Sequence, residues 1–407
     1  MTKKSDAPAI RFKGFSDAWE QREVGDLLIE RSQQAPMSDE YPLMAFIANE
    51  GVAPKGERYD RSALVTDTVN KLYKKTEKGD FIYSSNNLET GSIGLNKYGK
   101  ACISPVYSIF EPTGIADSDF LGRRLVRKDF INAMVKWRQG VIYGQWRIHE
   151  SDFLKIEISV PSVEEQRKIG AYLDQLDNLI TLHQRKFEKL TNVKKSMLEK
   201  MFPQNGSSYP EIRFKGFTDP WEQRKLGDVV KEITRNDPES EAPIMMITAN
   251  NGFIEQSERY AFNNAGESLK KYILLKKGEL AYNHGASKLR PYGSCFALTT
   301  AENARIPFVY HCFAAENQNA EFMSIELNSA EIENQLRKIV SSGARMDGLL
   351  NISFDEYTSV SVILPGTEEQ DRIADFFRHL DNLITLHQRE LEKLQNIKKS
   401  MLEKMFV

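Results

Sequence analysis

The ten residues LDNLITLHQR occur twice, at 176–185 and again at 380–389, and each copy is followed eight residues later by KKSMLEKMF. The repetition extends further, to residues 164–202 and 368–406. A second repeated passage opens each half: IRFKGFSDAWEQREVGD at 10–26 and IRFKGFTDPWEQRKLGD at 212–228. Such long internal matches indicate a tandem duplication. The chain is therefore built from two halves with similar ends.

The repeated closing passages predict two long helices. Their apolar residues fall three and four positions apart, the spacing of a coiled-coil seam. A proline precedes each passage, acidic residues begin it and lysines end it, while SVEE (162–165) and TEEQ (367–370) fit a capping box. The seam residues are Ile169, Leu173, Leu176, Ile180, Phe187 and Leu190 in the first helix, and Ile373, Phe377, Leu380, Ile384, Leu391 and Leu394 in the second.

Each helix should run for about 39 residues, close to about 58 Å at about 1.5 Å per residue. A seam of that length needs another helix to cover it, and the nearest candidate is the other copy. An antiparallel pairing of the two would give pseudo-twofold symmetry. The sequence thus predicts a globular domain at 1–161, a long helix at 162–204, a second globular domain at 205–365 and a second long helix at 366–407.

Between the repeated ends, only short matches remain, in the same order in both halves. They are FIANEGV (46–52) with ITANNGF (247–253), KGDFIY (78–83) with KGELAY (277–282), and YGKAC (98–102) with YGSC (292–295). The preserved order predicts one α/β (α+β) core in both halves, with differences in the connections. Cys102 and Cys295 are expected at matching, buried strand positions.

Composition excludes several classes of protein. No apolar run approaches the roughly 18 residues of a membrane span, and the start MTKKSDAPAIRFKG lacks the apolar segment of a secretory signal, so we expect a cytoplasmic protein without a membrane. Three cysteines show no CxxC spacing and six histidines are dispersed, so no metal is expected. With a net charge of −2, DNA affinity would depend on local patches or on partners.

Sequence motifs of common catalytic sites are missing. The chain has no Gly-x-Gly, no Gly-Lys-Ser/Thr, no Pro-Pro and no Glu-x-Lys. It therefore lacks the dinucleotide fingerprint, the phosphate-gripping loop, the Asn/Asp-Pro-Pro-aromatic motif of adenine methyltransferases and the commonest nuclease set. We expect a chain without catalysis and without a cofactor of its own.

Polar loops that follow short apolar strands are the candidate recognition elements. Asparagine can pair with adenine, and arginine or lysine with guanine, at base edges in the major groove. The alternative, weighed equally, is that these loops are merely solvated. The candidates are Ser84, Ser85, Asn86, Asn87 and Thr90 in the first half and Asn283, His284, Ser287, Lys288 and Arg290 in the second, with Lys97, Arg123, Arg124 and Arg345 as further basic candidates.

Two copies of F-K-G-F-x-D-x-W-E-Q-R-x-x-G-D, each followed by a variable region, a proline, EEQ and a helix ending KKSMLEKMF, resemble the specificity subunit of type I restriction and modification systems. The resemblance covers the whole chain. It implies two target-recognition domains, each reading one half of a bipartite double-stranded DNA site. It also implies long helices that pair antiparallel and set the gap between the half-sites.

The resemblance further implies partners. Two methyltransferase subunits would dock on the helices and bring S-adenosylmethionine for adenine methylation, and motor and nuclease subunits would add cleavage that depends on ATP and Mg²⁺. Base-contacting residues do not carry over, because the family varies there. Two alternatives stay open at this point: a subunit that directs methylation only, without a nuclease partner, and a coiled-coil adaptor protein.

Overall fold

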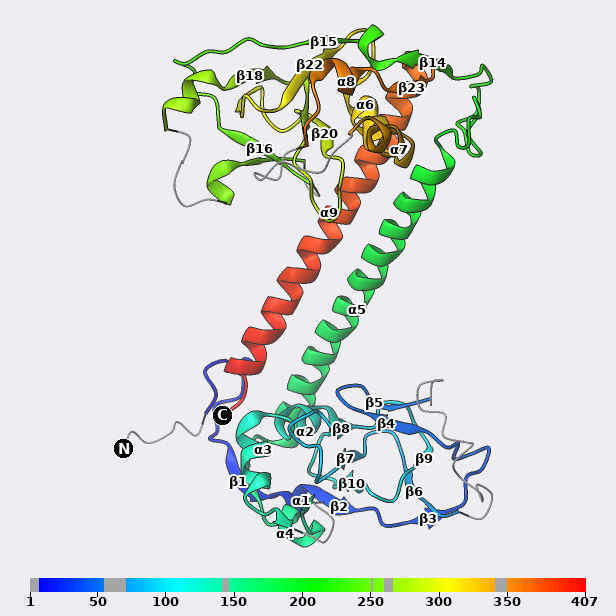
Figure 1. The fold of residues 1–407 in the computed structure, drawn as a ribbon. Coiled ribbons are helices and arrows are strands. Elements are labelled where there is room, and N and C mark those ends of the chain that lie inside the picture. The colour runs from blue at the N-terminus through cyan, green and yellow to red at the C-terminus, as the bar shows by residue number, and fades with distance from the viewer. Residues whose placement is uncertain (1–6, 55–70, 141–145, 250–251, 260–265, 341–349) are drawn as a thin grey trace. The chain divides into compact units, whose positions relative to one another are not determined.

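The computed structural model describes residues 7–54, 71–140, 146–249, 252–259, 266–340 and 350–407. It divides into two compact units: unit 1 comprises residues up to 185 together with 388–407, and unit 2 comprises residues 186–387. The two long helices, α5 (Val163–Lys200) and α9 (Thr367–Lys404), each have 38 residues. Each helix therefore contributes one part to unit 1 and the other part to unit 2 (Figure 1).

Unit 1 is built on a four-stranded antiparallel sheet with the order β2-β10-β7-β8, flanked by a three-stranded sheet β3-β6-β9 and the pair β4-β5. Strand β1 pairs with β13, and β11 pairs with β12. The elements before α5 are β1 (Glu20–Glu23), α1 (Val24–Leu27), β2 (Leu28–Glu30), β3 (Gln34–Ala35), β4 (Ala45–Ile47), β5 (Gly51–Ala53), β6 (Tyr73–Thr76), β7 (Phe81–Tyr83), β8 (Ile93–Leu95), β9 (Ala101–Ile103), β10 (Ser108–Pro112), α2 (Ser118–Arg124), α3 (Lys128–Val135), β11 (Gln139–Gly140), β12 (Trp146–Arg147), α4 (Glu150–Leu154) and β13 (Glu157–Val160).

Unit 2 repeats most of this order around the sheet β15-β22-β19-β20, with the pairs β14-β23, β16-β17 and β18-β21. Its elements are β14 (Glu222–Lys225), η4 (Leu226–Asp228), β15 (Val230–Glu232), β16 (Met245–Thr248), β17 (Gly252–Glu255), η5 (Gln256–Glu258), η6 (Gly266–Lys271), β18 (Ile273–Lys276), β19 (Leu280–Asn283), β20 (Ser294–Ala297), β21 (Asn303–Ile306), β22 (His311–Ala315), α6 (Ala320–Leu327), α7 (Ala330–Ile339), α8 (Phe354–Thr358) and β23 (Ser361–Leu364). The predicted mixed helix-and-strand fold in both halves is confirmed.

One predicted match between the halves is wrong. Cys102 lies on β9, which pairs with β6, whereas Cys295 lies on β20, which pairs with β19. Both cysteines are buried as expected, but they occupy different strands of the repeated order. The strand β20 corresponds to β8, so the true counterpart of Gly293 is Gly91, and both glycines have positive φ angles, of 83° and 95°. A Tyr-Gly pair precedes both β9 and β20, so this short sequence match does not distinguish the two strands.

Strand β7 is buried on both faces, which explains its apolar sequence. Phe81 and Tyr83 point to the core that includes α2, α3 and the start of α5, whereas Ile82 points to the core beneath β4, β5 and β9. Side chains alternate in this way along any strand. In β19 of unit 2, the side chains of Leu280 and Tyr282 likewise belong to one core and that of Ala281 to the other. The middle layer of each unit is therefore a rigid platform for the loop that follows it.

The repeated opening passage ties the two long helices together within each unit. In unit 1, the Arg11 guanidinium donates two hydrogen bonds, of 2.9 and 2.7 Å, to the buried carboxylate of Glu165 near the start of α5. The neighbouring Ile10 N–H donates to the carbonyl oxygen of Lys404 at the end of α9, at 3.0 Å. The start of one helix thus lies beside the end of the other, as an antiparallel pair requires.

Unit 2 repeats these contacts. Arg213 donates two hydrogen bonds of 2.7 Å to Glu369, and the Ile212 N–H donates to the Lys200 carbonyl oxygen at 2.9 Å. The expected capping box at the start of α5 forms only in part. The Ser162 hydroxyl accepts from the Glu165 N–H at 3.4 Å, but the Glu165 carboxylate binds Arg11 instead of closing the box. A charged partner from outside the helix binds a carboxylate more strongly than a neutral backbone N–H does.

The helix pair is held by ion pairs and by apolar packing in both units. Lys398 lies 2.5 Å from Asp177 in unit 1, and Lys194 lies 2.5 Å from Asp381 in unit 2. Of the residues assigned to the seam, Ile169, Leu173, Leu176, Ile373, Phe377, Leu380 and Leu391 are buried, and Ile180, Phe187, Leu190, Ile384 and Leu394 are half-buried. The buried ones near the helix starts join the cores of their own units as well.

A buried acid in unit 2 predicts a pH-dependent stability. Burial raises the pKa of Glu326, on the last turn of α6, from 4.5 to about 7, although the Ile363 N–H donates to its carboxylate at 3.2 Å. This acid favours the folded state fully below its ordinary pKa, and that contribution is lost as pH rises through about 7. We expect Glu326→Gln to stabilise unit 2 above pH 7 by up to about 3 kcal/mol, at about 1.36 kcal/mol per pKa unit, and to change little near about pH 4.

Thermal unfolding of the variant and the wild type across pH measures this difference. Glu316→Gln, at an exposed position shortly before α6, is the matched control and should leave the curve nearly unchanged. A Glu326→Gln variant whose free energy of unfolding differs from that of the wild type by the same amount at every pH would contradict the buried-acid interpretation.

Candidate nucleic-acid interface

The loop after β7, residues 84–92, is held in a fixed shape by its own backbone. The Ser84 N–H donates to the Ser92 carbonyl oxygen at 2.8 Å, and the Ser92 N–H donates to that of Asn87 at 2.9 Å. Gly91 has a φ of +95°, and a Cβ there would meet the Asn49 amide at 2.2 Å. The loop therefore requires glycine at this position and rests on the β4-β5 turn, where Asn49 also adopts a positive φ.

Two of the candidate base readers in this loop hold a neighbouring segment instead. The Ser85 hydroxyl accepts from the Ile148 backbone N–H at 3.0 Å, and the side-chain amide oxygen of Asn86 accepts from the Trp146 backbone N–H at 2.6 Å. Ser84 is buried and the Thr90 hydroxyl donates to the Asn87 carbonyl oxygen at 3.1 Å. Asn86, Asn87 and Thr90 are all exposed, and we take the Asn87 amide as the candidate reader because the side chains of Asn86 and Thr90 bind other backbone groups.

The corresponding loop of unit 2 follows β19 and also turns most of its candidates inward. The Asn283 amide donates to the Ile247 carbonyl oxygen at 3.1 Å and accepts from the Gly285 N–H at 2.9 Å. His284 is buried, and its ring nitrogens lie 2.8 and 2.6 Å from the carbonyl oxygens of Leu350 and Val309. His284 therefore fastens three segments of unit 2 together.

The tip of this second loop faces solvent. The Arg290 guanidinium donates to the Asn328 carbonyl oxygen at 2.8 Å. The Arg290 backbone N–H donates to the Ser287 hydroxyl at 3.0 Å, so Ser287 and Arg290 close a turn. Between them, Lys288 is exposed and Leu289 is 65% exposed. Lys288 is thus the charged candidate that the second loop presents to solvent.

The other basic candidates divide between ion pairs and solvent. Arg123 lies 2.7 Å from Asp174 and 2.9 Å from Asp177 on α5, and Arg124 is buried 3.0 Å from Asp129. Because these two guanidinium groups are engaged within unit 1, we withdraw them as phosphate contacts. Lys97 also pairs with Asp174, at 3.1 Å, but is 56% exposed. Arg345 lies outside the described residues.

The carboxylate that joins these cations is strongly acidic. Partial burial acts to raise the pKa of Asp174, but hydrogen bonds from Arg123 and Lys97 outweigh it and lower that pKa to about 2. Asp174 therefore stays charged at neutral pH and anchors α2 to α5. This network is structural rather than catalytic.

Two exposed tryptophans beside the first loop were not predicted. Trp137 and Trp146 are 41% and 48% exposed, at either end of the β11-β12 pair. Their aromatic character is visible in RQGVIYGQWR (138–147) and the residue before it, but sequence spacing gave no sign that this segment contacts the loop after β7. The contact spans about sixty positions, from Asn86 to Trp146.

Among the described residues, no group of three or more His, Cys, Asp or Glu side chains could hold a metal ion. No described helix combines the length and the apolar character needed to cross a membrane.

Comparison with known proteins agrees with this architecture. The family model described as the type I restriction modification DNA specificity domain matches residues 17–192 and again 218–396. The chain belongs to this family. It is therefore a DNA sequence-recognition subunit of the type I restriction-modification class, and the adaptor alternative is not favoured. The two matches fall on the two halves of the tandem duplication.

The chain is similar to curated specificity subunits. It is 24% identical over 416 residues to the type I restriction enzyme MjaVIII specificity subunit of Methanocaldococcus jannaschii, a match that covers 94% of this chain and 91% of that protein. It is 26% identical over 197 residues to the HindI specificity subunit of Haemophilus influenzae, covering 46% and 41%. The crystal structure of a type I system S subunit from M. genitalium superposes with a TM-score of 0.57 at 13% identity, covering 98% of this chain and 99% of that one, and so shares its fold.

Proposed function

We propose that each unit reads one half of a bipartite DNA sequence and that the chain directs adenine methylation by partner subunits. The observation that carries the proposal is the contrast between the two units. They share the order of strands and helices, yet the loops mounted on β7 and β19 present different side chains, Asn87 in one and Lys288 in the other. Two different readers on one frame recognise an asymmetric site, because specificity comes from base contacts and position from the frame.

The long helices carry a second repeated feature, which lies outside the cores. Leu179 and Leu182 in unit 1 are 43% and 45% exposed, and Leu383 and Leu386 in unit 2 are 37% and 52% exposed. Exposed leucines are not needed for the packing of either unit. Because they recur in an identical sequence, we propose that each pair docks one copy of the same partner, a methyltransferase subunit.

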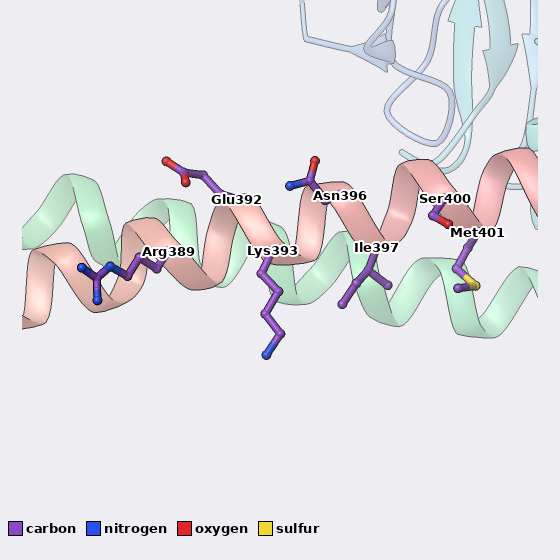
Figure 2. A pocket seen from close by; sticks show the side chains of 7 residues that line it. All are labelled: Arg389, Glu392, Lys393, Asn396, Ile397, Ser400 and Met401. Atoms are coloured by element: carbon purple, nitrogen blue, oxygen red, sulfur yellow. The ribbon is translucent and has the colours of Figure 1, made fainter. Parts of the chain in front are cut away.

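A groove on α9 is lined by residues that follow Leu386 in the sequence. It has a volume of about 580 Å³ and is lined by Arg389, Glu392, Lys393, Asn396, Ile397, Ser400 and Met401. Figure 2 shows Glu392 and Asn396 on one side of the helix and Lys393 and Ile397 on the other. The sequence of α5 repeats Arg, Glu, Lys and Asn at the equivalent positions 185, 188, 189 and 192. A mixed polar and apolar face of this kind suits a protein partner.

In this proposal the chemistry belongs to the partners. S-adenosylmethionine would bind the methyltransferase subunits, and ATP and Mg²⁺ would bind motor and nuclease subunits where these join the complex. The specificity subunit itself would position the DNA and perform no catalytic step. Reading and catalysis would then be separable, because the DNA-reading loops and the exposed leucines lie on different elements.

Replacing the exposed leucines tests the docking step. The change of Leu179 and Leu182 to aspartate should weaken binding of one methyltransferase copy by about 30-fold or more, since a charge in an apolar contact of this kind typically costs about 2 kcal/mol or more. The same change at Leu383 and Leu386 should weaken binding of the other copy. Light scattering of the purified complexes reports the number of subunits bound.

The matched control replaces the same leucines by methionine, which keeps the surface apolar. That variant should bind both copies. If the variant with all four aspartates still bound two methyltransferase subunits, the exposed leucines would not be the docking sites.

A further inference from the structure

The β11-β12 pair places an indole ring beside the loop after β7. Trp146 lies on β12. Its backbone N–H donates to the side-chain oxygen of Asn86 at 2.6 Å, which fixes the Trp146 backbone to the loop. The ring itself remains 48% exposed. Trp137, two residues before β11, is 41% exposed as well, so two indole rings near this pair of strands are available to contact a ligand.

Arg138 joins the two segments from the other side. Its guanidinium makes two hydrogen bonds, of 2.8 and 2.7 Å, to the Glu89 carboxylate, and its Nε donates to the Ser85 carbonyl oxygen at 3.1 Å. The same guanidinium lies 6.0 Å from the centre of the Trp146 ring. One side chain therefore sets the position of the loop and of the ring relative to each other.

The cations near Trp146 are partly balanced by acids. Arg147 is 57% exposed and lies 3.8 Å from the Glu150 carboxylate, and Lys136 is exposed one residue before Trp137. The Glu89 carboxylate is neutralised by Arg138, and that pairing lowers the pKa of Glu89. Cations of this kind can contact the phosphates of a DNA duplex, and an aromatic ring can contact apolar groups at its base edges, such as the thymine methyl.

The sequence of this segment favours DNA, rather than a protein partner that binds both units, as the ligand of this surface. Its counterpart in the second half, SSGARMDGLL (341–350), shares two glycines with RQGVIYGQWR (138–147) but has no aromatic residue, whereas the proposed docking faces for methyltransferase subunits are repeated. A surface that differs between the two units fits the ligand that differs between them. That ligand is the DNA half-site.

We propose that Trp146 is a base-contacting residue of the half-site read by unit 1. Its ring contacts base edges alongside the amide of Asn87, and Arg138 is a positioning residue that holds the two together. This inference rests on the proposed function of the chain as a reader of bipartite DNA. It assigns one half-site contact to a named surface that lies outside the loop after β7.

The test uses the assembled complex with its methyltransferase subunits. Duplexes with randomised bases are selected for binding by wild-type, Trp146→Ala and Trp146→Phe complexes and are then sequenced. We expect Trp146→Ala to lose base preference at positions in one half-site only and to bind the wild-type sequence about 10-fold or more weakly. Trp146→Phe should retain most of the preference, and Ile29→Ala, at an exposed residue on β2, should retain all of it.

The role of Arg138 has its own readout. Arg138→Gln should relax preference at the same base positions as Trp146→Ala, and the double variant should be no worse than the stronger single one, because coupled residues are not additive. A wild-type motif that Trp146→Ala leaves unchanged would overturn this inference alone. A wild-type complex that selects no two-part motif would overturn the proposed function and this inference with it.

Discussion

Phe406→Ala is expected to destabilise unit 1 by about 3–5 kcal/mol, although Phe406 lies at the end of the second repeat. Its ring lies 6.5 Å from Trp19 and 5.3 Å from Phe120, centre to centre, and the Arg127 guanidinium lies 5.4 Å from it. These contacts bring the end of the chain into the core of the first recognition unit. Removal of the ring leaves a cavity among large aromatic side chains, which cannot close without moving the helices.

The matched variant is Phe202→Ala, at the equivalent position of the first repeat. Phe202 packs 5.7 Å from Trp221 and 5.6 Å from Phe322, so its loss should destabilise unit 2 instead. Hydrogen exchange resolved by peptide would show faster exchange in residues 80–134 for Phe406→Ala and in residues 280–336 for Phe202→Ala. Each repeated helix thus ends in the core of the unit formed mainly by the other half of the sequence. Faster exchange in unit 2 for Phe406→Ala and in unit 1 for Phe202→Ala would contradict this arrangement.

Exchanging residues 212–364 for the recognition region of another specificity subunit should change one half of the methylated motif and preserve the other half. The physical reason is that unit 2 has its own apolar cores, which include Leu280, Phe313 and Leu275, and these contain no residue of the first recognition region. The expected effect is complete replacement of one half-site. Sequencing of methylated bases in DNA from cells that carry the chimera measures both halves at once.

The exchange works only if the donor keeps the contacts that fasten the helices. Arg213, which binds Glu369, and Trp221, which packs on Phe202, both lie within the exchanged segment. A donor with arginine and tryptophan at these positions should yield a folded chimera. The control chimera, with alanine at both positions, should be unstable because Glu369 is left buried without its cation. Altered recognition of both half-sites by the stable chimera would contradict the modular organisation.

The long helices, the duplication and the mixed fold could be predicted because each produces a sequence pattern that extends over many residues. Apolar residues at spacings of three and four continue through some forty positions, so local errors average out. The partner of Glu165 could not be predicted in this way. A capping box is a local pattern, and Arg11 reaches Glu165 from 154 positions away.

The candidate site was less predictable for the same reason. Asn86 and Ser85 have the chemistry of base readers, but they are hydrogen-bonded to residues 146 and 148, which approach only in the fold. His284 resembles a loop histidine in the sequence and is buried by Leu350 and Val309 from distant segments. Asn87 and Lys288 are exposed; Asn86 is exposed as well, but its side chain binds the Trp146 backbone. Which polar side chains stay in solvent is decided by these long-range contacts.

The central claim is that this chain makes methylation specific for a two-part DNA sequence. The most direct measurement is sequencing of modified bases in DNA from cells that express a cognate methyltransferase subunit with and without the chain. We predict a new methylated-adenine motif, in two parts with a fixed gap, only when the chain is present. Absence of any chain-dependent methylation, in cells where the complex is shown to assemble, would contradict the claim.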